Sequence, residues 1–251
     1  MDDAGDVSDV RRLIDDAERI VVLTGAGIST DSGIPDFRGP QGVWTRNPGA
    51  EKTATLQNYL ADPEVRKQAW RNRLESPTWH AEPNAGHRAI VALERRGKLH
   101  TLVTQNIDEL HQKAGTEPAK VVEIHGTMRQ VVCMSCGERA PMERALDRVR
   151  AGEEDPPCRT CGGILKSATI SFGQNLVMED LDRAERAATS CDLLLAVGST
   201  LTVHPAAGLV PLAKAAGARL VIVNAEETPY DPIADGVLRG SISEVLPAIL
   251  E

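Results

Sequence analysis

Aromatic residues are scarce in this sequence, at 3% of 251 residues, so its core has to be built from aliphatic side chains. Positive charge is not in excess either, because 28 Lys and Arg stand against 36 Asp and Glu. The net charge of −8 argues against nonspecific binding to nucleic acid. The first twelve residues contain four Asp and no apolar stretch, and no apolar run is long enough to cross a bilayer. We therefore expect a cytoplasmic globular protein with neither a membrane partner nor a specific nucleic-acid partner.

Short apolar runs, typical of buried parallel strands, recur along the chain. They lie at residues 20–24, 99–104, 121–124, 193–197 and 220–223. Segments with helical spacing lie between them, at 9–19, 85–96 and 206–216. Ser8 and Asn84 are the expected N-caps of the first two helices, and Gly97 directly follows the second. This alternation predicts an α/β fold with a Rossmann-like, doubly wound parallel sheet.

Two segments interrupt the alternation. Residues 40–82 are polar and punctuated by proline, which predicts a helical and loop insertion. Residues 127–167 contain four cysteines and a loose acidic, proline-containing run. We expect a Rossmann-like dinucleotide-binding domain over 1–126 and 168–251, interrupted by a small module over 127–167.

The cysteines of the small module form two Cys-x-x-Cys pairs, Cys133 with Cys136 and Cys158 with Cys161, separated by 21 residues. This spacing indicates a four-thiolate zinc ribbon, and the alternative of a redox pair or of chance pairs carries little weight. Four thiolates leave no open coordination position, so the expected single zinc ion is structural. Cys191, outside this set, is expected to be a buried packing residue.

A glycine-containing turn follows the first apolar run. It reads Gly25, Ala26, Gly27, Ile28, Ser29 and Thr30. Glycines in this position allow a backbone to approach a pyrophosphate, although the same turn also occurs without a ligand. Thr30 replaces the third glycine of the dehydrogenase fingerprint, and no acidic residue ends a second strand about twenty residues later. Both departures argue against an NAD-dependent dehydrogenase.

The longer stretch GAGISTDSGIPDFRG, residues 25–39, resembles the signature of the sirtuin family. Further matches follow in the family's order: TQNID at 104–108, His125-Gly126, the two cysteine pairs, Gly198-Ser199-Thr200 and Val223-Asn224. The resemblance covers residues 11–250, nearly the whole chain. It implies an NAD-dependent protein-lysine deacylase, with NAD as a co-substrate and proteins carrying acyl-lysine as partners.

The resemblance also implies roles for individual residues. It assigns His125 as the catalytic base that deprotonates a ribose hydroxyl, with Asn106 as a second catalytic residue. Phe37 and Arg38 belong to a loop that covers the cofactor. Asp108 and the backbone at Ile107 hold the nicotinamide carboxamide. The residues implied in cofactor binding are Gly25, Ala26, Gly27, Ile28, Ser29, Thr30, Asp36, Phe37, Arg38, Gln105, Asn106, Ile107, Asp108, His125, Gly198, Ser199, Thr200, Asn224 and Val237.

In the implied reaction, the acyl oxygen attacks the ribose carbon that bears nicotinamide, and the products are nicotinamide, lysine and O-acyl-ADP-ribose. The nearest alternative is a mono-ADP-ribosyltransferase. A dehydrogenase is disfavoured by the two departures given above, and a nucleic-acid-binding zinc-ribbon module by the acidic charge balance. Gln174 stands where the family usually has an acidic residue near the acyl-lysine channel. Trp70 and Arg73 have the spacing of the Tyr-x-x-Arg pair that marks removal of acidic acyl groups, but the tyrosine is missing. We therefore expect acetyl or another uncharged acyl group.

Overall fold

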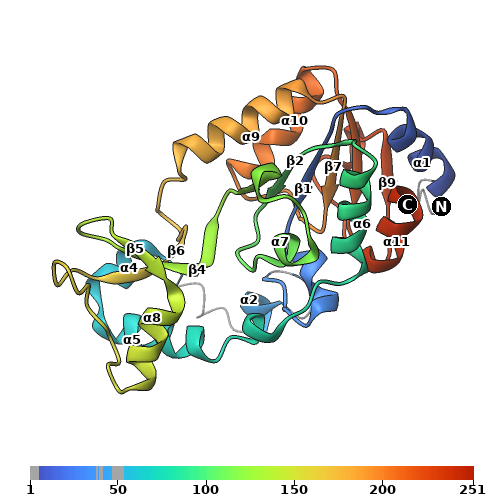
Figure 1. The fold of residues 1–251 in the computed structure, drawn as a ribbon. Helices are drawn as coiled ribbons and strands as arrows, with labels where there is room; N and C mark the ends of the chain where they lie inside the picture. The colour runs from blue at the N-terminus through green and yellow to red at the C-terminus, as the bar shows by residue number, and fades with distance from the viewer. Residues whose placement is uncertain (1–5, 38, 40–41, 47–53) are drawn as a thin grey trace.

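The computed structural model describes residues 6–37, 39, 42–46 and 54–251. Its larger part is a parallel sheet of six strands in the order β3-β2-β1-β7-β8-β9. The strands are β1 (Ile20–Thr24), β2 (Leu99–Thr104), β3 (Val121–Glu123), β7 (Leu193–Val197), β8 (Arg219–Val223) and β9 (Gly236–Leu238). In sequence order within this sheet, the arrangement is 3-2-1-4-5-6, which is the order of a dinucleotide-binding Rossmann sheet. The predicted Rossmann-like fold is confirmed (Figure 1).

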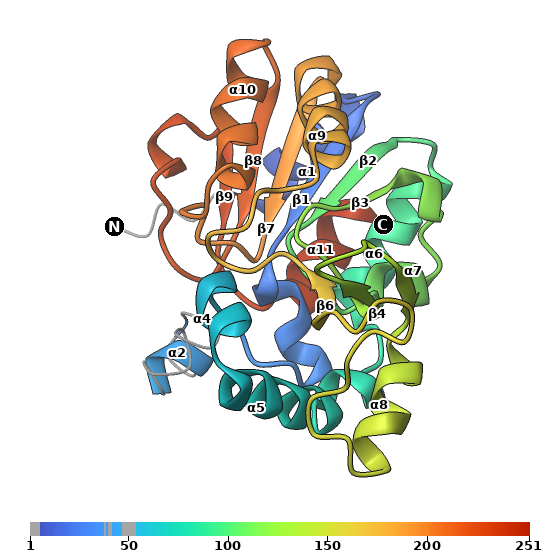
Figure 2. The same ribbon diagram turned by 90° about the vertical axis from the view of Figure 1, so that its left-hand side faces the viewer.

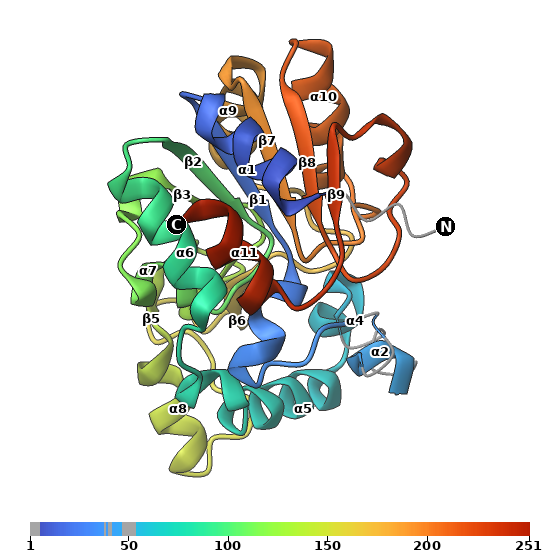
Figure 3. The ribbon, with the colours of Figure 1, turned by 90° about the vertical axis from the view of Figure 1, so that its right-hand side faces the viewer.

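Helices cover both faces of this sheet because alternate side chains of each strand point to opposite sides. Helices α1 (Val7–Asp16), α6 (Ala85–Arg95) and α11 (Ile242–Leu250) share one core with Val22 and Leu195 (Figure 3). Helices α9 (Met178–Ser190) and α10 (Leu209–Ala215) share the other core with Val21 and Leu194 (Figure 2). The sheet is therefore doubly wound.

The helix boundaries correct several expectations. Helix α1 begins at Val7 instead of residue 9, and its N-cap is Asp6, whose carboxylate accepts from the Ser8 backbone N–H. Asn84 caps α6 as expected, with its side-chain oxygen accepting from the Gly86 and His87 N–H groups. The expected helix at 206–216 divides into a 3-10 turn (Ala206–Gly208) and α10, with Pro211 in the first turn of α10, where a missing N–H is tolerated.

The smaller part of the molecule contains an antiparallel sheet, in the order β5-β4-β6. Its elements are β4 (Gly126–Cys133), β5 (Arg139–Pro141), α8 (Met142–Arg150) and β6 (Leu165–Thr169). Helices α4 (Leu56–Ala61) and α5 (Pro63–Leu74) lie beside it (Figure 2), and the 3-10 turn Pro77–His80 packs Trp79 against the same core. Trp70 of α5 packs in one core with Val131 and Leu146, so the two inserted segments form one small module.

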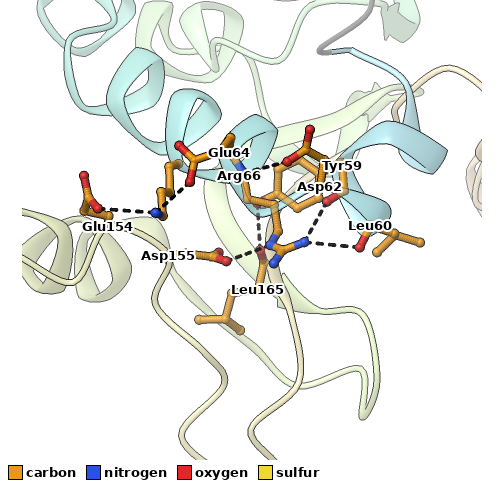
Figure 4. A network of polar contacts seen from close by, with 9 residues as sticks. Tyr59, Leu60, Asp62, Glu64, Arg66, Glu154, Asp155 and Leu165 are labelled. Atoms are coloured by element: carbon orange, nitrogen blue, oxygen red, sulfur yellow. Dashed lines mark hydrogen bonds and ion pairs between the residues drawn. The ribbon is translucent and has the colours of Figure 1, made fainter.

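Polar contacts reinforce this packing between the helical segment and the module (Figure 4). Arg66 of α5 forms an ion pair with Asp155 at 2.8 Å, and both side chains are largely buried. The same guanidinium donates to the carbonyl oxygens of Tyr59 and Leu60. The Tyr59 hydroxyl donates to the Leu165 carbonyl of β6 at 2.8 Å. These contacts fix α4 and α5 on the edge of the module.

Two further short helices are α2 (Val43–Arg46) and α7 (Leu110–Ala114), and 3-10 helices lie at Ala26–Ser32, Pro118–Lys120 and Asp231–Ile233. Within the described ranges, we find no helix that combines the length and the apolar character needed to cross a membrane.

Candidate active site

The glycine turn lies at the carboxyl end of β1, where the sheet order changes direction and α/β proteins bind ligands. It forms a 3-10 helix over Ala26–Ser32. A Cβ added at Gly25 or Gly27 would meet the Gly198 backbone at 2.7–2.9 Å. The Gly27 N–H donates to the Gly198 carbonyl at 2.9 Å. The close approach of the backbones at the ends of β1 and β7 therefore requires glycine at positions 25 and 27.

Asn106 and Asp108 follow β2 and are both buried against this turn. The Asn106 side-chain amide donates to the Gly25 carbonyl and to the Ser29 hydroxyl, both at 3.1 Å. The Ser29 hydroxyl donates to the Asp108 carboxylate at 2.8 Å, and the Leu110 N–H also donates to that carboxylate. Burial raises the pKa of Asp108, and these two hydrogen bonds partly oppose the rise. Residues nearly eighty positions apart thus form one polar cluster.

His125 lies in the turn between β3 and β4 and contacts the same segment. Its Nδ1 lies 3.1 Å from the Gln105 carbonyl oxygen, which can only accept a hydrogen bond. Nδ1 therefore carries the proton, and Nε2 is left with a lone pair. Burial is the main effect on His125 and lowers its pKa below 6.5, although the hydrogen bond to Gln105 acts in the opposite direction. The imidazole is a neutral base at neutral pH.

The ends of β7 and β8 supply the rest of the predicted site. The Gln105 side-chain amide donates to the Ser199 hydroxyl at 2.9 Å, which links β2 to the turn after β7. The Thr200 hydroxyl contacts that of Thr202 at 2.9 Å. Asn224 follows β8, is buried, and donates to the Glu226 carbonyl. Val237 lies in the edge strand β9, at the border of the sheet.

The predicted covering loop is described only in part. The Asp36 carboxylate accepts from the Gly39 N–H at 2.9 Å. The Phe37 side chain is 44% exposed. Arg38 lies outside the described residues. The Thr30 hydroxyl donates to the Gly27 carbonyl at the start of the same segment, and Ile28 is buried below it.

The four paired cysteines converge at one end of the small module. All four Sγ atoms lie within 4.8 Å of one another, with Cys133 to Cys161 at 3.5 Å and Cys136 to Cys158 at 3.8 Å. A tetrahedral zinc with bonds of about 2.3 Å places its sulfurs about 3.8 Å apart. The donor set and its spacing therefore fit a closed, structural zinc site. Cys191 is buried, as expected, beside β7.

Two features of the site were not predicted from the sequence. Glu109, the residue after Asp108, has a left-handed backbone with φ of 61°. Glu123 of β3 has a carboxylate oxygen that is buried without a hydrogen-bond partner. Burial and the nearby Glu109 carboxylate raise its pKa to about 7. No sequence signal marks the backbone of Glu109, whereas an acidic residue inside an apolar strand could have drawn attention to Glu123.

Comparison with known proteins shows which family shares this architecture. The model of the Sir2 family matches residues 25–205. The NAD-dependent protein deacetylase 2 of Streptomyces coelicolor is 53% identical over 231 residues, covering 92% of this chain and 96% of that protein. The NAD-dependent protein deacetylase 1 of Bradyrhizobium diazoefficiens is 44% identical, with 93% and 91% covered.

Solved structures indicate the same family. A structure described in work on the mechanism and regulation of Sir2 enzymes superposes with a TM-score of 0.87 at 40% identity, over 97% of this chain and 96% of that one. A Sir2 bound to an acetylated peptide superposes with a TM-score of 0.85 at 31% identity, over 96% and 95%. With the Rossmann strand order, the four-cysteine cluster and these relatives in agreement, the chain belongs to the Sir2 family, the sirtuins.

Proposed function

We propose that this chain is an NAD-dependent protein-lysine deacylase, which transfers the acyl group of acyl-lysine to ADP-ribose and releases nicotinamide and O-acyl-ADP-ribose. The observation that carries the proposal is the His125 imidazole, whose Nδ1 holds its proton against the Gln105 carbonyl oxygen, so that Nε2 keeps its lone pair. Relatives named NAD-dependent protein deacetylases support the same reaction.

When bound, NAD supplies an electrophilic ribose carbon and nicotinamide as the leaving group. The buried Asp108 carboxylate and the Ile107 backbone would hold the carboxamide, with Ser29 fixing the carboxylate by its hydrogen bond. Gln105 and Asn106 would face the adjoining ribose. Amide and carboxylate groups suit this task because both make directional hydrogen bonds.

The remaining contacts would lie along the carboxyl edge of the sheet. The turn formed by Gly25, Ala26, Gly27, Ile28, Ser29 and Thr30 would take the pyrophosphate, with Gly198, Ser199 and Thr200 opposite it. Asn224 would face the adenine-side ribose and Val237 the adenine. Asp36, Phe37 and Arg38 would cover the dinucleotide and exclude water.

His125 would accept the proton of a ribose hydroxyl through Nε2. The base is active when neutral, and burial lowers its pKa, so the active form persists below pH 6.5. We therefore expect the acidic limb of the kcat/KM profile to lie below pH 6.5, the ordinary value of histidine. A limb well above that value contradicts the assignment.

The expected substrates are proteins that carry acyl-lysine, with acetyl or another uncharged acyl group preferred. The Arg73 guanidinium donates to the Ser167 hydroxyl at 2.9 Å, and Trp70 packs in the core of the small module, so the pair is already engaged in structural contacts. The Gln174 side chain accepts from the Ser171 N–H, within its own turn. These contacts support an uncharged acyl group.

We also propose that Cys133, Cys136, Cys158 and Cys161 hold one structural zinc ion. The cytoplasmic location and the lack of a specific nucleic-acid partner stay predictions from composition. Mono-ADP-ribosyl transfer is the alternative reaction at the same site. Mass spectrometry separates the two, because ADP-ribosyl transfer leaves ADP-ribose on the acceptor protein, whereas deacylation leaves free lysine.

The direct test combines the purified protein, NAD and an acetyl-lysine peptide. We expect one nicotinamide released per peptide deacetylated, and deacetylation that proceeds equally without NAD contradicts the proposal. His125→Ala should lose turnover while retaining its thermal melting temperature. His100→Ala, which alters the Arg19 contact at the other end of β2, is the matched control and should keep full activity.

A further inference from the structure

The segment Gln105–Asp108 ends at a residue with an unfavourable backbone. Glu109 has a φ of 61°, in the left-handed region that non-glycine residues avoid. Such a conformation persists only where surrounding contacts over-determine it. Helix α7 begins directly afterwards, and its Lys113 N–H donates to the Glu109 carbonyl at 2.9 Å.

Consecutive residues of β4 in the small module hold this segment. The Thr127 hydroxyl donates to one Glu109 carboxylate oxygen at 3.2 Å. The Met128 N–H donates to the Ile107 carbonyl at 3.0 Å. The Arg129 guanidinium lies 3.4 Å from the other Glu109 oxygen, and both side chains are about one-third exposed. Strand β4 of the small module thus fixes a loop of the Rossmann-like part through both backbone and side-chain contacts.

Arg129 also contacts an aromatic ring of the helical segment. Its guanidinium carbon lies 4.8 Å from the ring centroid of Trp79, a cation–π arrangement. The Trp79 indole N–H donates to the Arg73 carbonyl at the end of α5 at 2.7 Å. Arg129 therefore has a defined orientation. Its positive charge also lowers the pKa of the Asp108 carboxyl, although burial remains the larger effect and raises it.

We propose that Glu109 and Arg129 are positioning residues, which hold the Gln105–Asp108 segment in the geometry that takes the nicotinamide end of NAD. This inference rests on the proposed role of that segment. It assigns to β4 a part in the affinity for NAD and for nicotinamide, separate from the zinc site at the far end of the strand. Neither residue touches the reacting atoms.

The test measures NAD and peptide separately on the full chain. For Glu109→Gln and Arg129→Met, we expect the KM for NAD and the inhibition constant of nicotinamide to rise together by about two- to fivefold, the size of a partly exposed ion pair. The KM for the acetyl-lysine peptide should stay unchanged. The KM for NAD of the double variant should be no higher than that of the more impaired single variant, because both changes remove the same contact.

Three further variants separate positioning from a merely structural role. Glu109→Gly removes the backbone strain together with the side chain, so it should melt no lower than wild type and still raise the KM for NAD. Thr127→Ser keeps the donated hydroxyl and should retain the wild-type KM, whereas Thr127→Val should raise it. Arg139→Met changes an exposed arginine of the neighbouring β5, which contacts Gln130, and should change neither constant.

An unchanged KM for NAD in both Glu109→Gln and Arg129→Met overturns the inference. So does an equal rise in the peptide KM, which would indicate a general loss of structure. A titration of nicotinamide against the chain gives a second reading that needs no turnover. If wild type binds nicotinamide but does not deacetylate, the proposed function fails and the positioning role can still be measured.

Discussion

Gly126 directly follows the proposed base, and the structure predicts that alanine at this position destabilises the fold and disturbs the site. Its φ is 72°, and a Cβ added there would lie 2.1 Å from the Ala168 carbonyl oxygen of β6. Gly126 pairs with Thr169 in the β4–β6 ladder, and the Ile170 N–H donates to the His125 carbonyl at 2.8 Å. The obstacle is therefore backbone, which cannot rotate away as a side chain can.

A matched control isolates the steric part of this effect. Gly97, after α6, has a φ of 74° and open space around the position of a Cβ. Gly97→Ala should lose about 1 kcal/mol, the strain of alanine in the left-handed region. Gly126→Ala adds the overlap with backbone, about 1–3 kcal/mol. For a chain of this length, 1 kcal/mol changes the melting temperature by about 2–4 °C.

The assay compares thermal melting and deacetylation for both variants. We expect Gly126→Ala to melt about 2–12 °C below Gly97→Ala. Its activity, measured well below the melting temperature, should fall further than its stability explains, because a displacement of about 1 Å in a catalytic group can lower the rate about a hundredfold. If the two variants melt together and both keep wild-type activity, the steric argument is refuted.

Other predictions concern the zinc site and buried charges. Chelation of zinc should release one ion per chain and lower the melting temperature, since metal binding contributes to folding; unfolded protein that yields no zinc contradicts this. Arg66→Met should destabilise by about 2–3 kcal/mol in a denaturant titration, against less than about 1 kcal/mol for Lys67→Met, whose Glu64 partner is exposed. Because the pKa of Glu123 is raised from 4.5 to about 7, the folded state binds its proton more tightly, and this carboxylate destabilises the fold as pH rises through that window. Glu123→Gln should therefore raise the melting temperature at pH 8 and have little effect at pH 4.5, and the reverse order refutes the sign.

The strands of the Rossmann sheet could be predicted because parallel strands buried on both faces read as continuous apolar runs. Residues 20–24, 99–104 and 193–197 have the bounds expected from the sequence. Helix ends were less certain because two caps compete near the start of α1, and Asp6 takes the role expected of Ser8. Local patterns fix an element's type better than its first residue.

Long-range contacts were beyond the sequence patterns. Nothing local indicates that Ser29 meets Asp108, or that Arg66 meets Asp155 across 89 positions. The requirement for glycine at 25 and 27 was attributed to pyrophosphate, and the structure adds the Gly198 backbone as a cause. These relations depend on which strand ends the sheet brings together, which single-residue patterns do not encode.

Strand β4 connects the two parts of the molecule, and this has a consequence for how zinc affects activity. The strand begins beside His125 and ends at Cys133, eight residues or about 25 Å along. Its first half is held by Ile107, by Glu109 and by the pairing of Gly126 with Thr169. Its second half pairs with both β5 and β6 and ends at Cys133, in the cysteine cluster. Loss of zinc removes the metal bond at Cys133 and leaves the pairing with β5 and β6 to hold this half alone. The strand should then fray from Cys133 toward Gly126, and the contacts near His125 should weaken last. We therefore expect activity to decline only after the Cys133 end of β4 has unfolded. Hydrogen exchange of the Val131 and Met128 amides during chelation measures that order, and faster loss of protection at Met128 contradicts it.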